Sequence, residues 1–287
     1  MKKNSFFKPS NLILFIILLI ICIMWLFPLY YILMSALRTD DSFRSLTFDE
    51  AFGFMLFPKD ATLETFKAVW ADNTRAPVGQ WFMNSLIVAA ASTILEVLVA
   101  SMAAFGYSRL DFPGRKVIFG FLMFTMMIPG VVNLIPQYKI VSMLGLKNNL
   151  LALILPGLAG VGNIFLIRQF FYSIPKDYDE AAKIDGASSL RVFYQILLPQ
   201  LVPVLVVVGL NTFLGSWNDL LWPIIIIEDT SKRTLTAGLS AINGVYDRNY
   251  ASKMAATVIS VIPVVIIFLV AQNFLLQGIS LSSGLKD

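Results

Sequence analysis

The chain has 287 residues, of which 57% are apolar and 14% charged, and its formal net charge is +4. Because soluble domains carry about 25% charged residues, this composition excludes an ordinary soluble enzyme and indicates a protein that crosses a membrane several times. The chain has no histidine and a single cysteine, Cys22. Histidine-based catalysis, an internal disulfide and a cysteine-rich metal site are therefore excluded, and we expect no metal ion and no other cofactor.

Six segments are long and apolar enough to cross the bilayer as helices, which takes about 20 residues for a core about 30 Å thick. In chain order they cover residues 11–36, 82–107, 117–136, 150–171, 200–227 and 254–276. The first apolar run is too long for the core of a signal peptide, so we expect it to remain as a membrane anchor. The sequence thus predicts an all-α, polytopic membrane protein with six transmembrane helices.

The segments between the spans define the expected organisation. Residues 1–37 form an N-terminus with the first span, 38–81 an extracytoplasmic loop, 82–276 a core domain with the other five spans, and 277–287 a tail. In the outer loop, Thr62 precedes an amphipathic stretch that ends near Trp70, and it is suited to cap that helix.

Charge indicates the orientation. With both termini in the cytoplasm, the inner segments hold half of the 22 Lys and Arg residues in a shorter total length, and three lysines precede the first span. The positive-inside rule therefore favours cytoplasmic N- and C-termini.

The inner loop 172–199 predicts two short helices. Pro175 suits a helix start, Asp177 and Asp179 fall in its first turn, and Gly186 supplies its stop. Ser188 or Ser189 can cap the second helix. That helix places five apolar residues on one stripe, at helical spacing, before a bend at Pro199; they are Leu190, Phe193, Tyr194, Leu197 and Leu198.

The first of these two helices is a candidate docking site for another protein, because small residues beside its charges let a partner approach closely. The alternative is a solvated surface helix that only links two spans. The candidate docking residues are Asp179, Glu180, Ala181, Ala182, Lys183, Asp185 and Gly186.

This loop resembles the EAA loop of ABC-importer permeases, in which EAA is followed at fixed spacing by G and then by I-x-L-P. Here the matching residues are Glu180-Ala181-Ala182, Gly186, Ile196 and Leu198-Pro199. The resemblance extends over nearly the whole chain to the carbohydrate-uptake permeases, particularly the branch that resembles maltose permease G. Its further matches are Phe57-Pro58 with Thr62-Leu63-Glu64, Asn84-Ser85-Leu86, Ala104 to Arg109 with Phe112 to Arg115, Met127-Ile128-Pro129, Leu144-Gly145-Leu146, Trp217-Asn218-Asp219, Thr234-Leu235 with Gly238-Leu239, and the tail Gly278 to Lys286.

Two positions depart from the family pattern. Residues 161–164 replace a frequent Ser-Leu-Pro-Phe run, and Asp219 replaces a usual Glu. Both positions concern solute preference and not membership of the family.

Charged side chains at membrane depth are costly and usually face the protein interior. Glu96 lies on a face of small residues, so it either lines a solute pathway or bonds to a neighbouring helix. Asp219 follows an aromatic and an amide residue, a combination that suits sugar binding and equally suits the membrane interface. The candidate pathway residues are Asn84, Glu96, Asn133, Asn163, Asn211, Trp217, Asn218 and Asp219, and Asn273 belongs to the same polar set. Arg168 is expected to extend to the membrane surface.

The resemblance implies a permease subunit of an ATP-driven, binding-protein-dependent importer for a sugar or oligosaccharide, with the type I ABC-importer fold, in a bacterial or archaeal inner membrane. The chain has no G-x-x-x-x-G-K-[ST] motif, so ATP hydrolysis belongs to another chain and this one is not an enzyme. The implied partners are a second permease, two ATP-binding subunits, an extracytoplasmic solute-binding protein and the lipid bilayer, with no nucleic acid. The alternatives are a stand-alone secondary transporter, which needs coupling-ion sites, and a membrane-integral enzyme.

Overall fold

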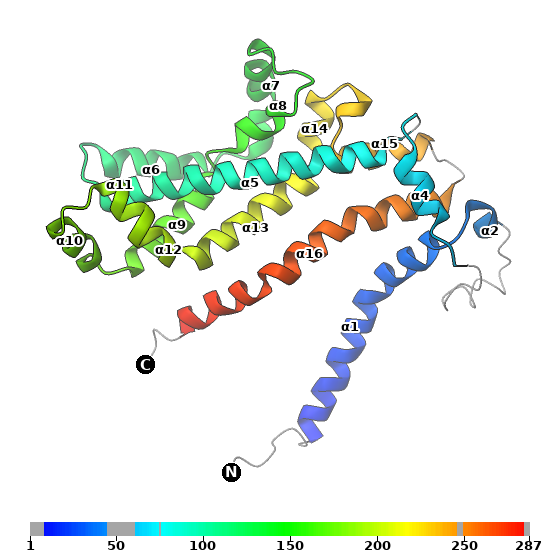
Figure 1. The fold of residues 1–287 in the computed structure, drawn as a ribbon, viewed down its shortest axis with the longest axis horizontal. Helices are drawn as coiled ribbons and strands as arrows, with labels where there is room; N and C mark the ends of the chain where they lie inside the picture. The colour runs from blue at the N-terminus through cyan, green and yellow to red at the C-terminus, as the bar shows by residue number, and fades with distance from the viewer. Residues whose placement is uncertain (1–8, 45–60, 75, 246–248, 284–287) are drawn as a thin grey trace. The chain divides into compact units, whose positions relative to one another are not determined.

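The computed structural model describes residues 9–44, 61–74, 76–245 and 249–283, which form helices and turns with no strand among them (Figure 1). The three N-terminal lysines, Phe57-Pro58 and the last four residues of the tail lie outside these described residues. The helices are α1 (Pro9–Ala36), α2 (Asp40–Arg44), α4 (Glu64–Ala71), α5 (Val78–Arg109), α6 (Arg115–Thr125), α7 (Leu134–Met143), α8 (Leu151–Ile154), α9 (Val161–Ser173), α10 (Asp177–Ile184), α11 (Ser189–Arg191), α12 (Leu198–Gln200), α13 (Val202–Asn218), α14 (Leu221–Ile226), α15 (Leu235–Val245) and α16 (Tyr250–Ser283).

Among the residues that the structure describes, three helices, α1, α5 and α16, are each long and apolar enough to cross a membrane. Three bent helix pairs there bring the total to six if each pair is one span. The third expected span, 117–136, is wrong as a single helix, because α6 and the helical segment Gly130–Met143 meet at 96°. Pro129 causes the break: it has no N–H to donate, and it disfavours helical geometry in the residue before it.

The bend expected at Pro199 is present two residues later. The segments Ser189–Gln200 and Val202–Asn218 meet at 81°. Pro203 lies in the first turn of α13, and its missing N–H leaves the carbonyl of Pro199 without the usual helical donor.

The chain divides into two compact units, residues 1–79 with 239–261 and residues 80–238 with 262–287. These units are defined by contacts between residues, whereas the expected domains were defined by the side of the membrane on which each segment lies. The expected boundaries at 37, 81 and 276 therefore stay a prediction.

In the first unit, Asp40 caps the start of α16: its carboxylate accepts the backbone N–H of Ala251 at 2.9 Å and the Ser252 hydroxyl at 2.7 Å. The Thr62 hydroxyl accepts the N–H of Glu64 at the start of α4.

The core of the second unit forms where α5, α9, α10 and the segment after α10 meet. Phe105 of α5 lies 6.1 Å from Phe171 and 5.0 Å from Phe193, measured between ring centroids. The small-residue face of α5 is buried, as its spacing predicts. Its buried members are Ser85, Ala89, Ser92, Glu96 and Ala100.

The stripe expected on the second inner-loop helix is partly wrong. Residues Val192–Leu197 form a π-helix, which has more residues per turn than an α-helix and therefore rotates the buried face. Val192, Phe193 and Leu197 are buried, whereas Leu190 and Tyr194 are exposed.

Arg168 does not extend freely to the surface as expected. Its guanidinium lies 3.9 Å from the ring centroid of Phe119 and 4.8 Å from that of Tyr172, and its Nε donates to the carbonyl of Tyr107. The cation is thus held on aromatic faces between α5, α6 and α9.

A second cluster joins α7, α8 and α14, where the Trp222 indole donates to the Ala152 carbonyl at 2.9 Å. Asn148, with a φ of 61°, accepts the N–H groups of Glu228 and Asp229 on its side-chain oxygen. Glu228 also lies 2.6 Å from Lys147 and raises the pKa of that lysine through a hydrogen bond. These contacts fix the loop before α8 against the loop after α14.

We expect Gly238→Ala to destabilise the protein, because a Cβ at this position would collide with the Trp81 indole. Overpacking of this kind costs about 1–3 kcal/mol. The loss is measured as a lower temperature at which the detergent-solubilised protein loses its monodisperse peak. Gly106→Ala is the matched control, since a Cβ there meets no atom within 4 Å; equal stability of the two variants would contradict this packing.

Candidate functional site

The helix α10 has an anchored face and a free face. Asp177, Asp179 and Glu180 occupy its first turn, where the helix dipole favours acids, and Lys183 lies in its last turn. Gly186 follows with a φ of +78°. Ser188, one of the two expected caps, accepts the N–H of Arg191.

Burial separates the seven candidate docking residues. Asp179 and Ala182 are buried against the second unit's core. The other five are exposed: Glu180, Ala181, Lys183, Asp185 and Gly186. The sequence argument missed two exposed apolar side chains on α10, Tyr178 at 50% and Ile184 at 86% exposure. The sequence could have indicated both residues, because each is apolar and lies outside the helical stripe that α10 buries.

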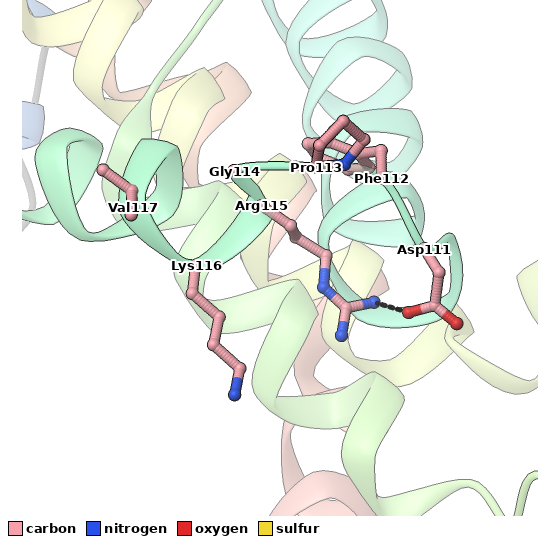
Figure 2. A pocket seen from close by; sticks show the side chains of 7 residues that line it. All are labelled: Asp111, Phe112, Pro113, Gly114, Arg115, Lys116 and Val117. Atoms are coloured by element: carbon pink, nitrogen blue, oxygen red, sulfur yellow. Dashed lines mark ion pairs between the residues drawn. The ribbon is translucent and has the colours of Figure 1, made fainter.

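The turn between α5 and α6, which carries the Phe112 to Arg115 motif, forms an open surface hollow (Figure 2). Arg115 pairs with Asp111 at 2.9 Å and donates to the Leu110 carbonyl, while Lys116 extends away from that pair. Gly114, with a φ of +80°, precedes the first residue of α6. The motif therefore builds a tight turn, and its charges do not converge on a common point.

A second candidate site is a polar cavity of about 330 Å³ between α5, α8, α9 and α13. Four of the expected pathway residues line it, namely Glu96, Asn163, Asn211 and Asp219. Its other lining residues are Ser92, Leu153, Gly157, Thr212, Gly215 and Ser216. None of these described lining residues is a Lys or Arg, so the polar side chains of the lining are hydroxyls, amides and carboxylates.

Glu96 is the centre of a network that joins three helices. Its carboxylate accepts the Asn163 amide at 2.6 Å and the Thr212 hydroxyl at 2.9 Å, and the residue is 6% exposed. Gly160 faces the same carboxylate so closely that a Cβ would collide with it. The Glu96 carboxylate therefore lies at the N-terminus of α9, where the helix dipole favours an acid. Glu96 thus bonds to neighbouring helices and also lines the cavity, and its place in a solute pathway stays a prediction.

The other four expected pathway residues do not line this cavity. Trp217 is 2% exposed and stacks on Phe213 at 5.7 Å. The Asn218 amide donates to the Leu214 carbonyl, and the Asn84 amide donates to the carbonyls of Ser231 and Arg233. Asn133 is exposed at the end of a 3-10 turn. The side chain of Asn273 lies outside the described residues.

Six of the lining residues were missed as candidates, and those on α13 carried a signal in the sequence. Thr212 and Ser216 are four residues apart on α13, and Asn211, Gly215 and Asp219 repeat with the same spacing. That spacing places polar or small residues along one helix face, which is the signal that could have found them.

The part of the chain that the structure describes has up to six candidate membrane spans, a cavity lined by polar side chains among its helices, and a short charged helix, α10, with an exposed face. A family model described as "Binding-protein-dependent transport system inner membrane component" matches residues 96–281. The chain belongs to this family of transport permeases.

Similar proteins support this assignment. The chain is 27% identical to the arabinooligosaccharides transport system permease protein AraQ of Bacillus subtilis (strain 168), over 100% of this chain and 99% of that protein. It is 32% identical to the sn-glycerol-3-phosphate transport system permease protein UgpE of Salmonella typhi, over 88% and 90%. A crystal structure of a bacterial ABC transporter that imports alginate contains a chain with the same fold, at a TM-score of 0.79 and 22% identity, covering 95% of this chain and 100% of that one. The expected ABC-importer permease fold is therefore confirmed.

Proposed function

We propose that this chain is one of two permease subunits in an ATP-driven importer of a neutral sugar or oligosaccharide, with both termini in the cytoplasm. Two ATP-binding subunits dock on the free face of α10, and an extracytoplasmic solute-binding protein delivers the solute. Hydrolysis of ATP in those partners moves the spans between inward-open and outward-open states. A partner can drive such a change only if it binds the two states with different affinity.

The observation that carries the docking assignment is the exposure of Tyr178 and Ile184 on a charged helix whose opposite face is anchored. An exposed aromatic side chain, which protein–protein interfaces favour, together with an exposed Ile184, supports a contact with a partner protein. A hollow of about 540 Å³ lies beside the same helix, lined by residues of α10 together with Pro175 and Ile196.

The lining of the cavity around Glu96 supports the proposal that the solute is neutral. One relative's name gives an oligosaccharide and another's gives a phosphorylated glycerol. Phosphate groups are normally recognised by Arg or Lys, and the described lining of this cavity has neither. Its amides, hydroxyls and carboxylates match the hydroxyl groups of an uncharged sugar. The pathway role of Glu96, Asn163, Asn211 and Asp219 belongs to this proposal.

Competition for uptake tests the solute class. Cells that express the complete importer take up a labelled neutral arabinooligosaccharide in the presence of unlabelled competitors. We expect unlabelled neutral oligosaccharides to reduce this uptake and sn-glycerol-3-phosphate to leave it unchanged. Uptake of labelled sn-glycerol-3-phosphate, with none of the neutral oligosaccharide, would contradict the proposal.

A further inference from the structure

The buried face of α10 carries an ion pair that does not belong to the docking surface. The Asp179 carboxylate lies 3.1 Å from Nε of Arg109, and the two side chains are 11% and 6% exposed. Arg109 is the last residue of α5, seventy positions earlier in the chain. The ion pair therefore joins the docking helix directly to a membrane-spanning helix.

Arg109 joins a third element as well. Its Nη2 donates to the carbonyl of Phe171 at 3.0 Å and to that of Ile174 at 2.6 Å. Both carbonyls lie at the C-terminal end of α9, where backbone carbonyls lack the usual helical donor four residues later. One guanidinium thus links α5, the end of α9 and the start of α10.

The pair is held by charge more than by a well-aligned hydrogen bond. Within the described chain, Arg109 Nε and Asp179 Oδ1 are buried and complete no hydrogen bond. Removing one member of such a pair leaves an uncompensated charge, which is far more costly than losing an exposed pair. Loss of either charge alone is therefore expected to weaken the contact between α10 and α5.

Three routes lead from α10 to the cavity. One covalent route runs back through Ile174 into α9, and the other follows the π-helix Val192–Leu197 and an 81° bend before it reaches α13. The third route crosses from Asp179 to Arg109 and follows α5, a helix with no proline in its sequence. Glu96 lies thirteen residues before Arg109, which is about 20 Å along a straight helix.

We propose that Arg109 and Asp179 act as positioning residues that make α5 move together with α10, so that displacement of the docking helix reaches Glu96 through α5. The inference rests on the proposed docking role of α10. The ion pair carries the movement and contacts neither the solute nor the ATP-binding partner.

The test compares uptake per ATP hydrolysed in the complete importer, reconstituted with its ATP-binding subunits and solute-binding protein. Asp179→Asn is expected to retain those subunits and to lower uptake per ATP about tenfold, within the usual range of coupling between sites. The exchanged pair Arg109→Asp with Asp179→Arg is expected to recover part of the loss. Asp111→Asn is the matched control, because Asp111 is exposed and its pair with Arg115 lies at the surface, where ion pairs contribute little. Uptake per ATP at the wild-type level in Asp179→Asn would overturn the proposal.

A cross-link gives an independent readout. In a Cys22→Ser background, Arg109→Cys with Asp179→Cys replaces the ion pair, and a short bis-methanethiosulfonate reagent then joins the two positions. We expect cross-linking to raise uptake per ATP above that of the untreated variant, because the two helices move as one. A cross-link that abolishes uptake would show that they must separate and would overturn the proposal. Glu180→Lys tests docking and Asp179→Asn tests coupling through the ion pair. We expect the ATP-binding subunits to be lost from the Glu180→Lys complex and retained in the Asp179→Asn complex, so failure of one proposal can be told from failure of the other.

Discussion

Glu180→Lys is expected to remove the ATP-binding subunits from the purified complex while membrane insertion is unchanged. Glu180 is exposed in the first turn of α10, next to the small Ala181. A lysine there reverses the charge offered to the partner and opposes the helix dipole. Residues central to protein interfaces contribute about 2 kcal/mol or more, which corresponds to about thirtyfold in affinity. The fold is expected to persist, because α10 is anchored through the opposite, buried face.

The measurement is the amount of ATP-binding subunit that co-purifies with the tagged chain from equal amounts of membrane. Glu64→Lys on α4 is the matched control, since it makes the same charge change at an exposed residue outside the inner loop. Normal recovery of the ATP-binding subunit with Glu180→Lys would remove Glu180 from the docking surface. Loss with both variants would indicate a general effect of charge.

Glu96→Leu is expected to abolish uptake and to lower the stability of the protein. The leucine leaves the Asn163 amide and the Thr212 hydroxyl without the carboxylate they now donate to. The Asn163 amide keeps its 3.3 Å bond to the Thr212 hydroxyl, but that hydroxyl loses its acceptor, and an unsatisfied buried donor costs about 1–3 kcal/mol. Removing a carboxylate from membrane depth is itself favourable by about 2.5–3.5 kcal/mol on insertion scales, but here the acid already has two donors and a helix N-terminus. The lost bonds therefore outweigh the gain.

Glu96→Gln separates the shape of this residue from its charge. Its amide oxygen still accepts from Asn163, and the Thr212 hydroxyl can rotate to accept from the new amide. We expect Glu96→Gln to retain the thermal stability of the wild-type protein in detergent and Glu96→Leu to lose it. Equal stability and uptake for Glu96→Leu and the wild type would show that the network has no role.

The spans and the elements of the inner loop could be predicted from the sequence, because both depend on local patterns. Apolar runs fix the spans, and the stop at Gly186 and the cap at Ser188 depend on one or two residues each. The break of the third span at Pro129 was harder to anticipate, because proline is tolerated in many membrane helices where neighbours satisfy the freed groups.

The positions of several candidate site residues could not be predicted, because they depend on contacts between residues far apart in the sequence. Asp179 was grouped with the docking residues, but its partner Arg109 is in another helix and turns it inward. Trp217, Asn218 and Asp219 are consecutive, so a helix directs them about 100° apart. Only Asp219, just past the end of α13, lines the cavity, whereas Trp217 packs in the interior.

Uptake into liposomes tests the central claim most directly. The chain is reconstituted with the second permease, the ATP-binding subunits and the solute-binding protein, and a labelled neutral oligosaccharide is supplied with ATP at the ATP-binding face. We predict uptake only when all components and ATP are present, and none with the chain alone. Uptake by the chain alone, without the ATP-binding subunits, would contradict this account and indicate a stand-alone secondary transporter.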